Sequence, residues 1–110
     1  MRTITKVFTG LSGTTEATAM DLKVQEHGRQ TWEFYADNSS ANIRIRLKSI
    51  FTDESGTEVA IPTIQTIDLT DETLTIVNFD MKLEHVRCTY DDDGTGSMAG
   101  DLHIKATTAK

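Results

Sequence analysis

The sequence contains few cysteine, proline and aromatic residues, and its apolar runs are short. Its 110 residues include one Cys, one Pro and 6% aromatic residues. The lone Cys88 excludes an intrachain disulfide framework and any zinc site built on several cysteines. The longest uninterrupted apolar runs, such as 59–61, have three residues, whereas a membrane-spanning helix needs about 20. We therefore expect no membrane partner.

Basic residues are also scarce relative to acidic ones. The chain has 11 Lys and Arg against 17 Asp and Glu, which gives a formal net charge of −6. A nucleic-acid-binding domain is expected to show a basic face, so no nucleic-acid partner is predicted. Residues 1–10 lack the apolar stretch of a secretion signal. The length is that of one ordinary domain, predicted over residues 1–110.

Threonine, in contrast, is abundant, with 18 residues in the chain. Threonine is β-branched and favours pleated, half-buried surfaces. Apolar and polar residues also alternate, most clearly where Ile43, Ile45 and Leu47 alternate with basic residues. Such a period of two is typical of strands in an antiparallel sheet with one buried face. The composition and the periodicity together predict an all-β chain.

Turn-forming residues divide the chain into short segments of regular spacing. They include the acidic segment 53–56, which predicts a hairpin between residues 44–51 and 57–61. About eight strands at this spacing predict an antiparallel β-sandwich, either immunoglobulin-like or jelly-roll-like. Residues 1–10 are expected to form an edge strand or an arm that pairs with another chain, and residues 106–110 a flexible tail. The strands are predicted within 3–9, 20–24, 32–36, 43–51, 57–61, 74–79, 83–90 and 102–106.

The densest acidic cluster consists of Asp91, Asp92 and Asp93, followed by Gly94. Adjacent carboxylates in a glycine-bearing loop are candidate ligands for calcium, which prefers oxygen. Their spacing differs from the alternating acidic positions of a calcium-binding loop. The favoured interpretation is a solvated hairpin tip, so no metal or other cofactor is predicted.

No local arrangement indicates catalysis. The three histidines are His27, His85 and His103, and the Gly-x-Ser-x-Gly pattern of a nucleophile elbow is absent. Cys88 alternates with predicted inward residues and is expected to be a buried, inert thiol. The sequence therefore predicts no catalytic residue and no enzyme.

Two features are candidates for an interface with a partner. Arg44, Arg46 and Lys48 form a basic stripe on one strand face, which either meets an acidic surface or pairs with Asp and Glu on neighbouring strands. Cross-strand pairing is the favoured interpretation. Tyr35 lies opposite Trp32 and Phe34 in its alternation and is predicted to be exposed, as interface aromatics are.

The order of elements from residue 42 to residue 106 resembles that of small phage virion proteins with immunoglobulin-like sandwiches. The resemblance rests on an alternating strand, an acidic turn ending in glycine, a strand with the pattern hydrophobic-Arg-x-x-Tyr, a glycine-rich segment and a closing strand. These elements lie here at 43–49, 53–57, 86–90, 91–100 and 102–104.

The resemblance implies a non-enzymatic subunit that decorates or cements a phage capsid. Its implied partners are the major capsid protein or other virion proteins, together with further copies of itself. Its implied location is the virion, after synthesis in the host cytoplasm. The alternatives are a neck or tail subunit of the phage, or a carbohydrate- or calcium-binding module that uses Asp91–Asp93 and Tyr35.

Overall fold

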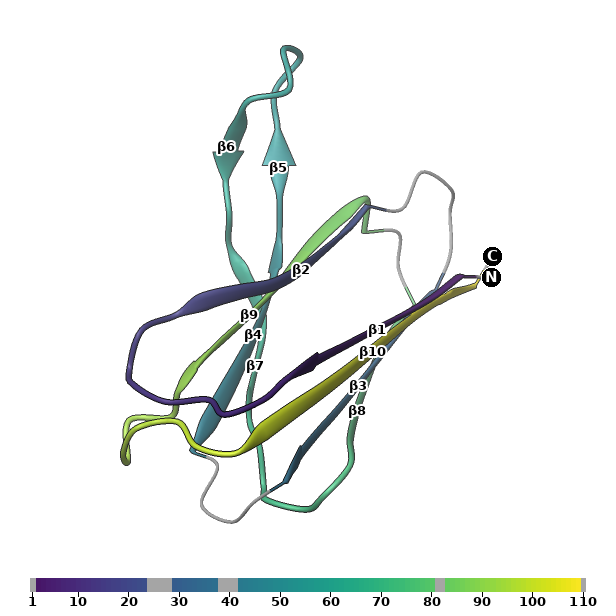
Figure 1. Cartoon of the computed structure of the whole chain (residues 1–110). Helices are drawn as coiled ribbons and strands as arrows, with labels where there is room; N and C mark the ends of the chain where they lie inside the picture. The colour runs from purple at the N-terminus through teal and green to yellow at the C-terminus, as the bar shows by residue number, and fades with distance from the viewer. Residues whose placement is uncertain (1, 24–28, 38–41, 81–82, 110) are drawn as a thin grey trace.

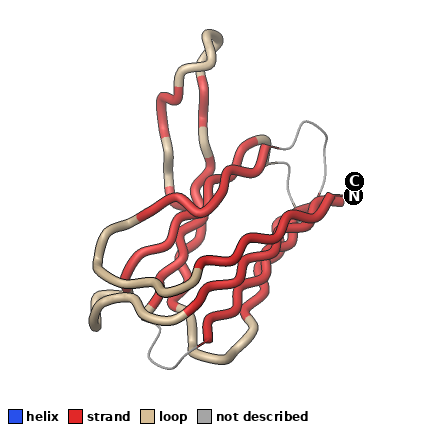
Figure 2. Tube along the Cα trace, in the orientation of Figure 1, coloured by secondary structure: helices blue, strands red, loops and turns tan. Residues whose placement is uncertain are grey.

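The described residues of the chain form strands and loops only. A computed structural model describes residues 2–23, 29–37, 42–80 and 83–109, and in them Figure 2 shows strands joined by loops. No helix in these ranges is long and apolar enough to cross a membrane. The strands are β1 (Arg2–Phe8), β2 (Ala17–Lys23), β3 (Arg29–Asp37), β4 (Ile43–Ser49), β5 (Phe51–Thr52), β6 (Glu58–Ala60), β7 (Thr63–Asp68), β8 (Thr75–Phe79), β9 (His85–Asp92) and β10 (Asp101–Ala109).

Two four-stranded antiparallel sheets form a sandwich (Figure 1). Sheet A has the strand order β1-β10-β3-β8, and sheet B has the order β2-β9-β4-β7. Each of the first three connections along the chain passes from one sheet to the other, which is the wiring of a jelly roll. An immunoglobulin domain would place its first two strands in the same sheet. The all-β sandwich is confirmed, and its strand order is that of the jelly-roll alternative.

The core lies between the two sheets and follows the predicted alternation. In β3 every second side chain is buried, and Trp32, Phe34 and Ala36 are fully enclosed. In β4 the buried side chains are Ile43, Ile45 and Leu47, as expected. Val24, the last residue of the strand predicted within 20–24, lies outside the described residues. The largest other fully buried side chains are Leu22, Leu102, Ile104, Gln30, Val86 and Cys88.

Two sequence expectations about loops and strands were wrong. Strand β7 was missed because all its side chains except Ile67 are exposed, so it has no alternating pattern. The acidic segment after Tyr90 is no hairpin tip. Asp91 and Asp92 still belong to β9 of sheet B, and the chain then crosses to β10 of sheet A. The crossing occurs because β10 pairs with β1 and β3 rather than with β9.

The predicted hairpin exists, but it leaves the sandwich. Strands β5 and β6 pair only with each other, and they extend away from both sheets (Figure 1). We call residues 51–61 the hairpin arm. Its turn is closed by the Asp53 carboxylate, which accepts hydrogen bonds from the amides of Ser55 and Thr57, and by Gly56 at φ 88°. The radius of gyration of 14.1 Å exceeds the value of about 13 Å for a compact chain of this length, as a projecting arm requires.

The first and last strands of the chain lie side by side in sheet A (Figure 1). Strand β1 is an edge strand and pairs along its whole length with β10, from Arg2 opposite Thr108 to Phe8 opposite Leu102. Strand β10 continues to Ala109, beyond residue 106 where the predicted strand ends. One side of β1 therefore carries paired backbone groups, and the other side is an open edge.

Candidate functional site

The basic stripe on β4 lies on the outer face of sheet B, where carboxylates of neighbouring strands meet it. Arg44 stands opposite Asp68 of β7, and its Nε lies 2.7 Å from Oδ1 of Asp68. The Nη1 of Arg46 lies 2.9 Å from Oδ2 of Asp91 on β9. The cross-strand pairing that was favoured from the sequence is confirmed. The charge of the stripe is largely compensated within the chain itself.

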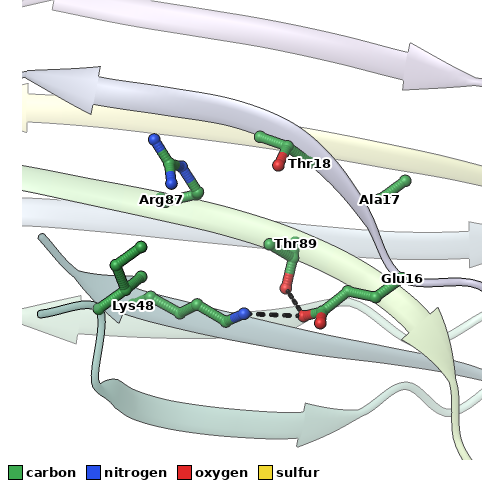
Figure 3. A pocket seen from close by; sticks show the side chains of 7 residues that line it. Glu16, Ala17, Thr18, Lys48, Arg87 and Thr89 are labelled. Atoms are coloured by element: carbon green, nitrogen blue, oxygen red, sulfur yellow. Dashed lines mark hydrogen bonds and ion pairs between the residues drawn. The ribbon is translucent and has the colours of Figure 1, made fainter. Parts of the chain in front are cut away.

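Glu16, just before β2, completes this network beside a small hollow of about 260 Å³ (Figure 3). Its Oε2 lies 3.0 Å from Nζ of Lys48 and accepts a 2.6 Å hydrogen bond from the Thr89 hydroxyl. That hydrogen bond, together with the neighbouring Lys48 and Arg46, lowers the pKa of Glu16 against the opposing effect of burial. Of the two cations that line the hollow, Lys48 pairs with Glu16, and Arg87 pairs with Asp21 and Glu58. The hollow therefore offers no uncompensated positive charge to an anionic ligand.

Arg87 joins strand β6 of the hairpin arm to the outer face of sheet B. Its guanidinium donates to Asp21 of β2 at 2.8 Å and to Glu58 of β6 at 3.0 Å. His85 lies next to it, with Nε2 at 3.0 Å from the same Asp21 oxygen. Burial raises the pKa of Asp21, but the hydrogen bonds from Arg87 and His85 outweigh it and lower the pKa overall. These contacts fix the direction in which the arm leaves the sandwich.

The three candidate calcium ligands do not converge. Asp91 binds Arg46, and its other oxygen accepts the amide of Asp92 at 2.8 Å. Asp92 accepts the amide of Gly94, and Asp93 accepts the amide of Thr95. In the described part of the chain, no group of three or more His, Cys, Asp or Glu side chains has an arrangement that would hold a metal ion. The segment is a series of separate turn contacts.

Tyr35 and His103 are neighbours on the outer face of sheet A. Their ring centroids are 6.1 Å apart, and they line a shallow hollow of about 200 Å³ together with the exposed Leu74. The Nε2 of His103 lies 3.4 Å from the Asp37 carboxylate. Tyr35 is only partly exposed, because the neighbouring strands cover part of its ring.

His85, His103 and Cys88 lie apart from one another. His85 is on the outer face of sheet B, His103 is on the outer face of sheet A, and His27 lies outside the described residues. Cys88 is fully buried between the sheets, as expected, and burial raises the pKa of its thiol. A buried thiol of raised pKa forms little thiolate and is a poor nucleophile.

The two most exposed large apolar side chains of the described residues lie on the hairpin arm, and the sequence pattern did not predict their exposure. Phe51 is 64% exposed and Val59 is 56% exposed. Ile61 and Ile64 are also exposed at the base of the arm. The sequence feature that marks this region is the short apolar run 59–61 directly after an acidic turn. This run was interpreted as part of a sandwich strand. Clustered exposed apolar residues on a projecting element indicate a contact surface.

Solved structures share the fold at low sequence identity. A Bacillus endospore appendage, from a family of disulfide-linked pili, aligns with a TM-score of 0.59 at 10% identity over 96% of this chain and 82% of its own. The Yersinia pseudotuberculosis-derived mitogen aligns with a TM-score of 0.60 at 12% identity over 96% and 83%. The SPBc2 prophage-derived protein YomS aligns with a TM-score of 0.52 at 17% identity over 99% and 96%. No family model and no curated protein sequence matches the chain. These likenesses concern the fold alone, and the strand order of the two sheets defines that fold as a jelly-roll β-sandwich.

Proposed function

We propose that this chain is a non-enzymatic structural subunit of a phage particle, and specifically a capsid decoration or cement subunit that binds the assembled head. The observation that carries the proposal is the hairpin arm, which holds Phe51 and Val59 in solvent outside the sandwich. Exposed apolar side chains contribute little to the stability of the chain that carries them. They contribute to binding affinity when a partner surface covers them.

The fold supports the same role. Jelly rolls are the architecture of many viral capsid domains, and the prophage-derived YomS shares this fold over nearly its whole length. A small arm buries only a small area, so a single contact is weak. Many copies on a symmetric shell add avidity to such contacts, and a subunit that binds only the assembled state stabilises it.

The test is co-sedimentation of the purified chain with phage heads assembled without it, followed by thermal disruption of those heads. We expect saturable binding and a higher disruption temperature when the chain is bound. The variant Phe51→Thr/Val59→Thr is expected to bind at least about tenfold more weakly, since hot-spot truncations commonly cost more than 1.4 kcal/mol. The matched control is Ile76→Thr, which alters a side chain of similar exposure on β8 of sheet A.

The location of bound chains separates the head from the other parts of the virion. Labelling of complete particles with an antibody against the chain is expected to decorate the head. A label at the neck or along the tail would replace the head assignment with a neck or tail subunit. Absence of binding to any part of the particle would contradict a virion role altogether.

A further inference from the structure

We propose that the hairpin arm of one copy docks on the open edge of strand β1 of a second copy, in a head-to-tail contact. The inference rests on the proposed role as an assembly subunit, and it specifies how copies of the chain contact one another. It is carried by two unpartnered surfaces of complementary chemistry on one molecule.

The arm is apolar and acidic. Between Lys48 and Lys82 the sequence contains no Lys or Arg, while the arm contains Asp53, Glu54 and Glu58, of which Glu58 pairs with Arg87 of the same chain. Glu54 is exposed at the turn, and Phe51 and Val59 are exposed on the two short strands. An apolar centre with charged neighbours is the usual anatomy of a protein interface.

The β1 edge is apolar and basic. The first acidic residue of the chain is Glu16, and before it come Arg2 and Lys6, both exposed on β1. Lys105 is exposed on the adjoining β10, opposite Thr5 of β1. Among the described residues, none of these three cations forms an ion pair. Val7 of the same strand is 52% exposed, and the open edge leaves backbone groups available for pairing.

The two surfaces cannot meet within one molecule. The strands of the arm pair only with each other, and Glu58 ties the arm to Arg87 on the outer face of sheet B. Strand β1 belongs to sheet A, and the arm extends away from it (Figure 1). Contact of an acidic arm with a basic edge therefore requires a second copy.

Charge also selects the geometry of the contact. Two arms placed against each other would bring like charges together, which disfavours a two-fold arm-to-arm dimer. When the arm of one copy contacts the β1 edge of another, opposite charges are paired. The resulting assembly has one free arm at one end and one free β1 edge at the other. Such heterologous contacts continue from copy to copy and produce rings or open chains, as a subunit of a repeating assembly requires.

The first experiment measures self-association of the full chain by sedimentation velocity over a wide concentration range. We expect species larger than a monomer, which dissociate more readily at 0.5 M salt, where the Debye length falls to roughly 4 Å. Phe51→Thr/Val59→Thr is expected to weaken association by about tenfold or more, whereas Ile76→Thr leaves it unchanged. A wild-type chain that stays monomeric throughout, or an equal effect of Ile76→Thr, would overturn the proposal.

A charge exchange identifies the two contacting surfaces. Glu54→Lys reverses the arm and Lys6→Glu reverses the edge, and each variant alone is expected to associate several-fold more weakly than the wild type. The double variant, with both reversals in one chain, is expected to recover association. If the double variant is as weak as either single variant, the two surfaces do not meet. Head binding is measured separately, so a wild-type chain that binds heads but does not self-associate rejects this contact and leaves the proposed function standing.

Discussion

Strand β3 and the hairpin arm are both made of strand-forming residues, but they place their apolar side chains in opposite environments. In β3 every second side chain is buried, and Trp32, Phe34 and Ala36 have no exposed surface. In the arm, Phe51 and every residue of β6 are exposed. The apolar residues of β3 are explained by folding, whereas those of the arm are not.

This difference distinguishes the residues that stabilise the fold from the residues that are available for contact with another molecule. Burial of a large apolar side chain stabilises a fold by about 1.5–3 kcal/mol, and an exposed side chain gains little of this. The arm keeps its shape through its turn, where Asp53 accepts three hydrogen bonds from Ser55 and Thr57. Substitutions in β3 should therefore change the free energy of unfolding, and substitutions in the arm should change association.

The largest expected effect is that of Trp32→Ala. The indole fills the centre of the core, and its Nε1 donates to Oε1 of the buried Gln30 at 3.1 Å. We expect a loss of about 3–5 kcal/mol in the free energy of unfolding, because a large cavity and an unpaired amide oxygen remain. Urea denaturation followed by circular dichroism measures it. A loss below about 1 kcal/mol would mean that the core does not depend on this side chain.

Cys88→Ser is a smaller change in the same core. The two side chains have similar volumes, but the serine hydroxyl would be enclosed at a position surrounded by apolar residues. We expect a loss of about 1–3 kcal/mol, the cost of burying a polar group that lacks a good partner. The same denaturation assay tests this, with the surface variant Thr66→Ser as a control that should remain close to the wild type. Equal stability of Cys88→Ser and wild type would contradict a tightly packed site.

Acid should weaken the sandwich through the charged face of sheet B. The pKa of Glu16 is lowered from its ordinary value of 4.5, chiefly by the Thr89 hydrogen bond, and Arg46 lowers that of Asp91. A carboxyl whose pKa is lower in the folded state stabilises the fold above its ordinary pKa, and this contribution is lost as the pH falls through the lower value. We expect stability to decline below about pH 4.5.

The variant Glu16→Gln isolates one carboxylate in that profile. Because the Glu16 side chain is partly exposed, we expect it to cost at most about 1 kcal/mol at neutral pH. Its difference from the wild type should shrink towards low pH, where the wild-type carboxyl is protonated. Thermal unfolding between pH 2 and pH 7 measures both curves. A difference independent of pH would show that the lost contribution is packing rather than charge.

The sequence predicted what depends on local alternation. Strands β3 and β4 alternate because one face meets the core, and the periodicity identified their buried residues before the structure did. The pairing of Arg44 and Arg46 with carboxylates was also expected, since charges on the solvent face of a sheet find cross-strand partners.

The features that depend on how the chain passes between the two sheets could not be predicted from local alternation. Strand β7 is exposed on an edge, so its residues carry no alternation. The segment after Asp92 has the composition of a hairpin turn, yet it crosses to the other sheet because β10 pairs with β1 and β3. The exposure of Phe51 likewise follows from the point at which the hairpin leaves the sandwich, between Ser49 and Phe51.

The smallest expected effect on stability is that of Phe51→Thr/Val59→Thr in the arm. Both side chains are exposed, and threonine retains β propensity, so we expect the free energy of unfolding to stay within about 0.5 kcal/mol of the wild type. Urea denaturation at a concentration where the chain is monomeric measures it. A loss comparable to that of Cys88→Ser would mean that the arm packs on the sandwich and that its apolar residues serve folding. If the free energy of unfolding is unchanged, these two side chains do not serve folding. Contact with another molecule is then the property that they can affect.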